Sequence, residues 1–368
     1  MKKIASPILH TAAACLFSLL LLFVCNNLHA QLLKVGVAGL NHDHAYGLMS
    51  QYKKGEVIIL GIAEPDAQLV NRYKQRYQLA DSLFYPTVAA MLQRIKPDAV
   101  LAYNAIADHL SVVEACAPKG ISVMVEKPLA TTVKKAQRMA ALAAQYHVQV
   151  LTNYETTWYP SNQQVYDMVK AKNAVGTVKK MVVHMGHQGP KEIGCSEDFL
   201  KWLTDPVKNG GGAVMDFGCY GANLMTWLMG SRPIAVTAIT RKIKPAIYPN
   251  VDDDATILLE YANGATGIIE ASWNWPFGIK DWEVFGEHTY LHALNGNTLQ
   301  RRDRDSAVYY NVPVSSPAYT SNLVYLADVL HGKIQAVNDL SSLHNNLLVV
   351  EILQAAKLSA KEGRKIVL

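Results

Sequence analysis

Cysteine is scarce in this sequence, with five residues among 368, and two of the five lie in an apolar N-terminal stretch. The other three are Cys116, Cys195 and Cys219. A small, odd set of widely spaced cysteines excludes the disulfide framework of a small secreted domain. At most one bridge can form, and we expect buried thiols instead.

An excess of charge of either sign is also missing. The formal net charge is +5, from 35 basic and 30 acidic residues. This balance lacks the basic surplus of nucleic-acid-binding proteins, so we predict no nucleic-acid partner. Low-complexity segments are absent too. With 50% hydrophobic and 18% charged residues the composition is that of a globular protein, which excludes a disordered chain.

The longest hydrophobic run lies at the N-terminus. Lys2 and Lys3 precede an apolar segment that ends in a small-residue exit at Ala30, which is the order of a secretory signal peptide. We predict that residues 1–30 are such a signal, of the general secretory type, because the twin arginines of folded export are absent. The mature protein would begin at Gln31, in the periplasm or outside the cell, without stable membrane association. An uncleaved membrane anchor is the alternative interpretation.

Length and pattern together predict two domains. Single cores rarely grow beyond about 250–300 residues, so this chain is long enough for two. Up to residue 154, short apolar runs alternate with helical stretches, which is typical of parallel strands joined by crossover helices. The predicted strands are 34–39, 57–64, 99–104, 122–126 and 148–153, and the predicted helices are 45–54, 66–78, 87–95, 109–117 and 132–145.

The pattern changes after Tyr154. The dipeptides Asn263-Gly264 and Asn295-Gly296 favour tight hairpin turns. We therefore predict an N-terminal α/β domain, 31–153, and a C-terminal α+β domain, 154–368, with a large, mostly antiparallel open sheet. In the second domain, strands are predicted at 178–187, 233–241, 256–261 and 266–273, and helices at 211–229 and 343–360.

The segment after the first predicted strand resembles the glycine turn of a Rossmann dinucleotide-binding domain. Gly39 holds the first position of the G-x-G-x-x-G pattern, while Asn41 and His44 replace the other two glycines. Glycines let backbone amides approach a pyrophosphate, and asparagine tolerates left-handed backbone angles better than most residues. We interpret the turn as a modified cofactor site. A metal site on the His42-x-His44 pair is the alternative.

Glu64 stands at the end of the second predicted strand. An acid there can accept hydrogen bonds from both ribose hydroxyls and would repel the 2′-phosphate of NADP, so it favours NAD. The alternative interpretation is that Glu64 merely caps the next helix.

Two further motifs carry groups suited to chemistry. The sequence Glu126-Lys127-Pro128 ends another predicted strand, where ligands of open α/β sheets gather, so Lys127 is placed to face a ligand; a solvated surface lysine is the alternative. In the predicted helix 211–229, Asp216, Tyr220 and Asn223 fall on one face. A ligand explains such a polar face better than solvent does, and buried hydrogen bonds to the scaffold are the alternative.

In their order along the chain, the glycine turn, Glu126-Lys127-Pro128 and the pattern Gly-Gly-x-x-x-Asp-x-Gly-x-Tyr of 211–220 resemble the glucose-fructose oxidoreductase and inositol dehydrogenase (Gfo/Idh/MocA) family. The resemblance spans nearly all of the mature chain. It implies a Rossmann domain that holds NAD, or less favourably NADP, and a second domain whose open sheet covers the substrate and supports a homo-oligomer. The implied activity is hydride transfer between this cofactor and a small-molecule sugar or polyol.

The resemblance also implies roles for individual residues. Lys127 matches a lysine near the nicotinamide and the reacting hydroxyl, Asp216 matches an aspartate that orients the substrate, and Tyr220 stands where many members have histidine. Tyrosine is ordinarily a poor base at neutral pH, but a nearby lysine cation would lower its pKa. We therefore predict Tyr220 as the acid–base group, Lys127 as its electrostatic partner, and Asp216 and Asn223 as sugar ligands.

The remaining predicted contacts come from the same regions. Tyr154 and Trp158 follow the last strand of the first domain and are predicted to stack on a sugar ring, with core packing as an equal alternative. Asp43 would put negative charge beside the pyrophosphate unless it caps the helix or points away, and His42 or His44 would compensate by donating to phosphate. The predicted cofactor-binding set is Gly39, Asn41, His42, His44, Glu64, Asn104, His109, Glu126 and Lys127.

Export bears on the activity, because a secreted enzyme meets no large pool of free NAD. Either the cofactor is held tightly and recycled, or hydride is borrowed and returned within one turnover, as in NAD-dependent glycoside hydrolases that oxidise a sugar, eliminate the aglycone and reduce again. Two other classes stay open. One is a metal-dependent hydrolase that adds His184-x-x-His187 to the first histidine pair, although residues i and i+3 of a strand face opposite sides. The other is a non-catalytic sugar-binding protein.

Overall fold

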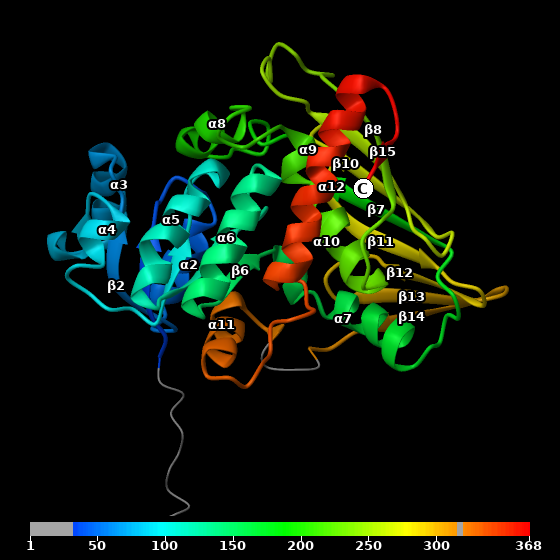
Figure 1. Cartoon of the computed structure of the whole chain (residues 1–368), viewed down its shortest axis with the longest axis horizontal. Helices are drawn as coiled ribbons and strands as arrows, with labels where there is room; N and C mark the ends of the chain where they lie inside the picture. Colours follow the sequence, from blue (N-terminus) through cyan, green and yellow to red (C-terminus); the bar gives the residue numbers. More distant parts are fainter. Residues whose placement is uncertain (1–31, 315–318) are drawn as a thin grey trace, which may run out of the picture.

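The structure is a computed structural model, and it describes residues 32–314 and 319–368. The predicted signal peptide, 1–30, lies outside the described residues. Two sheets stand side by side in Figure 1, with helices around the first sheet and between the two. Within the described part of the chain, no helix is both long and apolar enough to span a membrane.

The first sheet has six parallel strands in the order β3-β2-β1-β4-β5-β6. Its central strands are apolar and buried, as parallel strands covered on both faces must be. The strands are β1 Lys34–Ala38, β2 Ile58–Ala63, β3 Phe84–Tyr85, β4 Ala99–Ala102, β5 Ser122–Glu126 and β6 Val150–Asn153. The predicted Rossmann-type sheet is therefore confirmed, and β3 is an addition too short to leave a sequence pattern.

The helices of the first domain lie close to their predicted positions. Asp66, Thr87 and Thr132 each cap a helix by accepting hydrogen bonds from backbone N–H groups of its first turn. The helices are α2 Ala45–Lys53, α3 Ala67–Tyr77, α4 Val88–Met91, α5 His109–Cys116 and α6 Val133–Tyr146. Only α4 is much shorter than expected, because it ends at Met91 and turns follow it.

The strand order reverses between β1 and β4, and ligands of open α/β sheets bind in the crevice that such a reversal creates at the carboxyl ends of the strands. The segment 39–44 follows β1 at this edge. Glu126 is the last residue of β5, and Asn153 is the last residue of β6. The fold therefore brings the two predicted motifs of the first domain to one edge.

The second sheet has nine strands in the order β14-β13-β12-β11-β7-β10-β9-β8-β15. Among the described strands β7 and β10 pair in parallel and the other neighbours pair antiparallel, so the predicted mostly antiparallel sheet is confirmed. The strands are β7 Lys180–Gly186, β8 Ala235–Arg241, β9 Asp254–Glu260, β10 Thr266–Ser272, β11 Ile279–Phe285, β12 Thr289–Ala293, β13 Thr298–Asp303, β14 Ser306–Asn311 and β15 Ile366–Val367.

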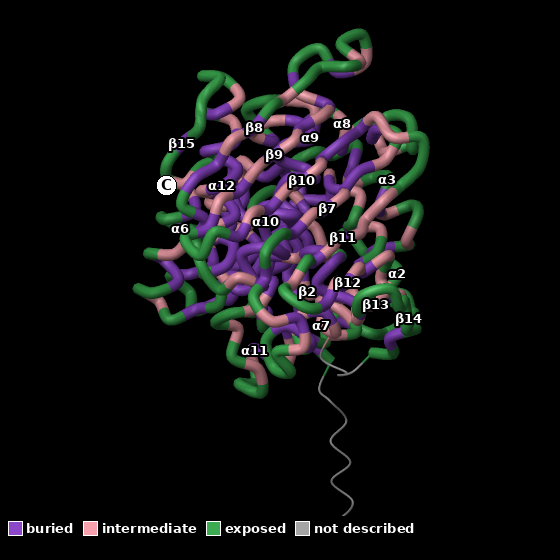
Figure 2. Tube along the Cα trace, turned by 90° about the vertical axis from the view of Figure 1, so that its right-hand side faces the viewer, coloured by how far each residue is buried: buried purple, intermediate pink, exposed green. Residues whose placement is uncertain are grey.

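Helices cover one face of this second sheet. Along β9, buried residues alternate with half-exposed ones, and Ile257 and Leu259 belong to the same buried core as Leu224 and Leu353 of the covering helices. Figure 2 shows the buried stretches concentrated between the strands and these helices. The helices of the second domain are α7 Pro160–Tyr166, α8 Glu197–Leu203, α9 Ala213–Asp216, α10 Gly218–Met229, α11 Asn322–Leu330 and α12 Leu343–Glu362.

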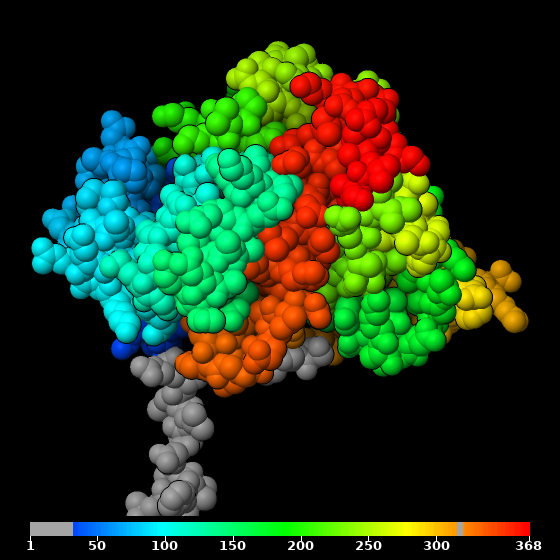
Figure 3. All heavy atoms as spheres, viewed as in Figure 1, coloured from blue at the N-terminus to red at the C-terminus, as the bar shows by residue number. Residues whose placement is uncertain are grey.

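Two late helices join the domains. Helix α12 contacts α6 of the first domain as well as α10 and β8 of the second, and Figure 3 shows its atoms packed along the seam between the two. Helix α11 inserts Leu323, Tyr325 and Leu326 into the core of the first domain. Cys116 and Cys219 are buried free thiols and Cys195 is a half-buried one, in agreement with the expected absence of a disulfide framework.

Candidate active site

The segment 39–44, called here the cofactor turn, has one position where only glycine fits. Gly39 has a φ of 82°, and a Cβ there would lie 2.6 Å from Cβ of Asn104. Its N–H donates to the carbonyl of Ala63 at 2.8 Å, which bends the chain away from β1. Side chains replace the other two glycines of the pattern without such a conflict.

Glu64 holds the cofactor turn from the end of β2. Its carboxylate accepts the N–H of Leu40 at 2.8 Å and the N–H of Asp66 at 2.9 Å. Burial raises the pKa of Glu64, and these N–H donors oppose the rise. The helix-capping interpretation of Glu64 is wrong, because Asp66 caps α3. Glu64 lines a cavity of about 250 Å³ with Asn41 and Asp66.

The groups around this cavity fit a dinucleotide. The side-chain oxygens of Asn41 and Asn104 are buried and have no hydrogen-bond partner among the described residues. Buried polar atoms are rarely left unpaired, so a ligand that donates hydrogen bonds would satisfy them. Glu64 has the acidic side chain suited to ribose hydroxyls.

Helix α8 of the second domain closes over the cofactor turn. Trp202 donates from Nε1 to the carbonyl of Asn41 at 2.9 Å, and Ser196 donates its N–H to the Asp43 carboxylate at 2.9 Å. The ring of His42 packs between Trp202 and Phe199, with centroids 5.5 and 4.6 Å away. Asp43 therefore points toward α8, which removes the expected conflict with a pyrophosphate.

A buried ion pair forms the second part of the site, called here the charge centre. The Lys127 ammonium binds the Asp216 carboxylate and donates to the Asp216 carbonyl at 3.0 Å. Trp273 donates to the other carboxylate oxygen at 2.9 Å. Burial would raise the pKa of Asp216, but Lys127 holds it below its usual value. Burial likewise disfavours the Lys127 cation, yet Asp216 keeps the lysine pKa above its usual value.

Tyr220 lies against the charge centre. The Lys127 ammonium is 5.1 Å from the centre of its ring and the Lys280 ammonium is 5.5 Å away. Burial, followed by the charge of Glu155, raises the pKa of Tyr220 well above its ordinary value. The expectation that the lysine would lower this pKa is wrong, because burial of the phenol disfavours the phenolate more than the cations favour it.

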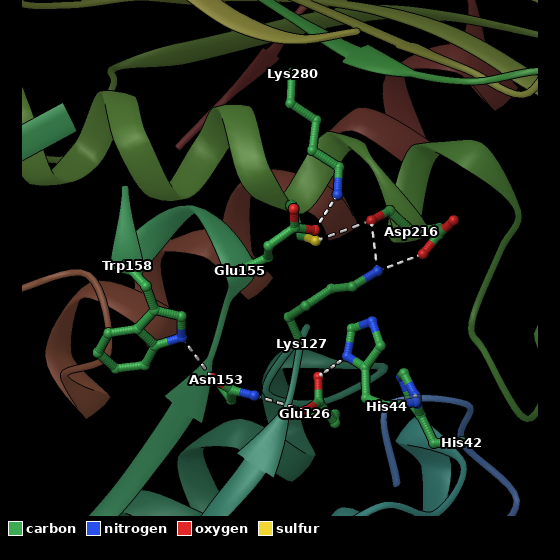
Figure 4. Close-up of polar contacts among 10 residues, drawn as sticks. His42, His44, Glu126, Lys127, Asn153, Glu155, Trp158, Asp216 and Lys280 are labelled. Carbon is green, nitrogen blue, oxygen red and sulfur yellow. Dashed lines mark hydrogen bonds and ion pairs between the residues drawn. The ribbon is translucent and has the colours of Figure 1, made fainter. Parts of the chain in front are cut away.

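A hydrogen-bonded row of side chains lies beside the charge centre (Figure 4). Trp158 donates to Asn153 at 3.2 Å, Asn153 donates to Glu126 at 2.7 Å, and the other oxygen of Glu126 lies 2.9 Å from Nδ1 of His44. Burial would raise the pKa of Glu126, but the nearby His44 lowers it. This row lines a cavity of about 570 Å³ that Glu155 also borders.

A further cavity of about 640 Å³ opens on the other side of Glu155. Glu155 forms an ion pair with Lys280 and accepts a hydrogen bond from Tyr159. All three residues line this cavity, and Glu155 lines the 570 Å³ cavity as well. Lys280 belongs to β11, whereas Glu155 and Tyr159 follow β6, so segments distant in the sequence share this part of the site.

Comparisons with known proteins agree with this geometry. Residues 33–154 match the family described as "Oxidoreductase family, NAD-binding Rossmann fold", and residues 162–292 match the "GFO/IDH/MocA C-terminal domain". The chain belongs to the Gfo/Idh/MocA family. The first match spans the whole first sheet, whereas the second covers the second domain from α7 into β12 and leaves out β13, β14 and β15.

Individual relatives of the family are distant. The rhizopine catabolism protein MocA of Rhizobium meliloti is 26% identical, over 57% of this chain and 63% of its own length. D-apiose dehydrogenase of Paraburkholderia graminis is 22% identical over 91% of this chain and 88% of its own. The chain covers about half to two thirds of the length of the first curated relatives.

Solved Gfo/Idh/MocA-type structures share the fold. An aldose–aldose oxidoreductase from Caulobacter crescentus superposes with a TM-score of 0.78 at 20% identity, over 92% of this chain and all of the other. An inositol dehydrogenase homologue from Azotobacter vinelandii, complexed with NAD+, superposes with a TM-score of 0.79 at 17% identity, over 92% and 98%.

The prediction that Asp216, Tyr220 and Asn223 lie on one face of a single helix, 211–229, is wrong. The helix is broken at Phe217, so Asp216 lies on α9 while Tyr220 and Asn223 lie on α10. Asn223 is not placed as a sugar ligand: it is fully buried and donates to the carbonyl of Leu340 at 2.8 Å. Its role is to join α10 to the segment before α12, which is the scaffold alternative.

The two predicted aromatic contacts differ in exposure. Tyr154 is fully buried, with its ring edge on Tyr220 at 5.4 Å, so for this residue the core-packing alternative is correct. Trp158 lines the 570 Å³ cavity. His109, predicted as a cofactor contact, is fully buried with Nδ1 3.1 Å from the carbonyl of Leu129, and burial lowers its pKa to about 4.

The metal alternative finds only partial support in the geometry. Ligand atoms of His42, His44 and Glu126 lie within 4.8 Å of one another. Glu126 and His44 already bind each other, however, and Nδ1 of His42 accepts the N–H of His44 at 3.1 Å. His184 is instead bonded to Asp281 on the second sheet, at 2.7 Å, so the proposed second histidine pair does not complete the cluster.

Four site residues escaped the sequence analysis: Trp202, Trp273, Glu155 and Lys280. Glu155 stands inside the noticed segment after β6, and its charge among aromatic residues was the available signal. Nothing local distinguishes the other three, because their positions depend on how the second domain folds over the first.

Proposed function

We propose that this protein is an NAD-dependent oxidoreductase that converts a CH–OH group of a small carbohydrate or polyol into a carbonyl group. The observation that carries the proposal is the buried Lys127–Asp216 pair, placed at the same sheet edge as the cofactor turn. Related proteins named as dehydrogenases of xylose, apiose and dihydrodiols support the substrate class.

The residues of the two parts have separate tasks. Gly39, Asn41, Glu64 and Asn104 would hold the dinucleotide, which supplies the acceptor for the hydrogen leaving carbon. Lys127, fixed as a cation by Asp216, binds the reacting oxygen and stabilises negative charge that develops there. Five carboxylates, among them Glu64, and two lysines, Lys201 and Lys208, line the cavity of about 250 Å³, and this excess of negative charge opposes a 2′-phosphate, which supports NAD over NADP.

Retention of the cofactor is part of the proposal. The contacts of α8 with Asn41, Asp43 and His42 cover the cofactor turn, and they would slow the release of a bound dinucleotide. A retained cofactor suits the predicted signal peptide and a periplasmic or secreted location. A homo-oligomer is supported by the half-exposed outer face of the second sheet, where apolar side chains such as Ile239 and Tyr309 are exposed.

A direct test is to mix the purified protein with a panel of sugars and polyols and to follow the near-ultraviolet absorbance of reduced nicotinamide. Absorbance that rises to one reduced cofactor per chain and stops is the expected result for a retained dinucleotide. A second, carbonyl-bearing substrate should then reoxidise it. A dinucleotide-loaded protein that responds to no member of the panel contradicts the proposal.

The cavity beyond Glu155 favours NAD-dependent glycoside cleavage as a second candidate. The space next to the first cavity has room for a leaving group, and Glu155 borders both. Elimination requires removal of a carbon-bound proton, so cleavage in heavy water would place deuterium in the sugar product. Cleavage without deuterium uptake, or no cleavage of any glycoside, excludes this candidate.

A further inference from the structure

His44 replaces the last glycine of the turn, and its side chain does not cap the helix that follows. It stands at the first position before α2, and its ring makes no capping hydrogen bond there. The side chain is 43% exposed and borders the 570 Å³ cavity. Its ring contacts that of His42, with centroids 4.4 Å apart, but a half-exposed histidine on a cavity wall, in a position where glycine would suffice, indicates a role toward a ligand.

The carboxylate of Glu126 orients this ring. Glu126 is 2% exposed, and its two oxygens are held by Asn153 and by Nδ1 of His44. Asn153 is fixed in turn by Trp158. Because Nδ1 donates to the carboxylate, Nε2 of the neutral ring carries a free lone pair, and Figure 4 shows this nitrogen pointing away from Glu126 toward Lys127.

Four other titratable groups near the charge centre are poorly suited to accept a proton, and a fifth, His187, accepts the N–H of Gly189 at Nδ1 and lines the 640 Å³ cavity rather than the 570 Å³ one. Lys127 is a cation held by Asp216, and Asp216 is engaged by both Lys127 and Trp273. Tyr220 is 2% exposed, and its burial disfavours the phenolate. Glu155 is paired with Lys280.

We propose that His44 is the acid–base residue of the dehydrogenase and that Glu126 is its positioning residue, an inference that rests on the proposed function. The alcohol carbon gives its hydrogen, as hydride, to the oxidised nicotinamide dinucleotide, and the alcohol oxygen gives its proton to Nε2 of His44. The products are a carbonyl compound, the reduced dinucleotide and an imidazolium, whose charge the Glu126 carboxylate stabilises. Lys127 binds the oxygen during this exchange.

Several titratable and charged groups lie around the ring. The groups are Asp43 and His42 of the cofactor turn, Glu126 and Lys127 at the end of β5, Glu155 after β6, and Lys54 after α2. Among these groups Glu126 is the one whose side chain is bonded to the ring.

The experiment compares His44→Ala, Glu126→Gln and Tyr220→Phe with the wild type, all carrying their dinucleotide. Gln51→Ala, which alters the same cavity wall without removing a titratable group, is the matched control. In His44→Ala we expect cofactor reduction to slow by about 10²–10⁴-fold, the usual range for a general base, with dinucleotide content unchanged. Added imidazole should restore part of the rate, and Tyr220→Phe should lose much less.

Glu126→Gln supplies a readout that does not need turnover. A glutamine amide is a weaker acceptor than a carboxylate, so the ¹⁵N NMR signals of the His44 ring in the loaded protein should show less of the Nδ1-protonated tautomer than in the wild type. The less well oriented ring should also slow cofactor reduction.

The outcomes separate this inference from the proposed function. A wild type that reduces its cofactor with a sugar, together with His44→Ala at the wild-type rate and Tyr220→Phe inactive, overturns the role of His44 alone. Loss of dinucleotide, or of a bound metal, in His44→Ala also overturns it, because the ring would then be a ligand to that group. A loaded wild type that no sugar reduces overturns both.

Discussion

The cofactor turn and the charge centre meet at one edge of the first sheet, but they differ in how their polar atoms are satisfied. At the charge centre, both oxygens of the Asp216 carboxylate and the Lys127 ammonium are bonded within the protein. At the cofactor turn, the amide oxygens of Asn41 and Asn104 are buried without a described partner. The charge centre is therefore complete without a ligand, whereas the turn is completed by one.

This difference predicts which change harms folding and which harms binding. Removing one residue of the buried Lys127–Asp216 ion pair leaves the other residue with an uncompensated charge in the folded protein. Blocking the turn leaves every buried charge paired but removes the room for the ligand.

Lys127→Met should abolish turnover and also lower the free energy of unfolding. The loss of stability should be about 3–5 kcal/mol, because Asp216 stays buried without its partner. Denaturant unfolding measures this change. Adding Asp216→Asn should recover most of the stability and none of the activity. Full stability in the single variant would show that the pair is not desolvated as described.

Gly39→Ala should remove dinucleotide binding. Its Cβ would collide with Asn104 in addition to the cost of a left-handed alanine, which is roughly 1–2 kcal/mol. Gly55→Ala is the matched control, with a φ of 74° and open space around the Cβ. After incubation with NAD and removal of the unbound nucleotide, the NAD content should be about one per chain in Gly55→Ala and near zero in Gly39→Ala. Equal binding in both variants would contradict the assigned turn.

Acid should destabilise the protein through His109. Its pKa is about 4 in the folded protein, against an ordinary value near 6.5, so the unfolded chain binds more protons between these limits. Stability should therefore fall as pH falls from 6.5 toward 4, by about 3 kcal/mol in total. In His109→Asn the free energy of unfolding, measured at several pH values, should change less with pH than in the wild type. An unchanged pH dependence would show that another group causes it.

Asn223→Ala should affect stability alone. The carbonyl of Leu340 would lose its hydrogen bond in a buried position, at a cost of about 1–3 kcal/mol. Thermal unfolding and steady-state kinetics of the same preparation check this. A raised KM for the sugar with unchanged stability would restore Asn223 as a substrate ligand.

The sequence allowed the first sheet, its helices and the nature of the second sheet to be predicted, because apolar periodicity and caps are local signals. It also identified Lys127 and Asp216 through their motifs. The partners of these residues could not be predicted in the same way. Trp273 follows the end of β10 and Lys280 belongs to β11, so their roles depend on strand register and on contacts between distant segments.

Burial accounts for the wrong assignments. Asn223 and Tyr154 have side chains suited to sugars, but both are fully enclosed by the packing of α10. The pKa of Tyr220 was expected to fall near a lysine, and desolvation reversed its direction. Sequence gives the chemical type of a side chain, whereas solvent access is decided only when the two domains close.

The most direct test of the account is to denature the purified protein and to identify the small molecules that it releases by mass spectrometry. The account predicts about one equivalent of NAD per chain, either carried through purification or taken up when NAD is added to the protein. Release of no nucleotide, together with no uptake of added NAD by the folded protein, would contradict the claim that the cofactor turn with Asn41 and His44 still holds a dinucleotide.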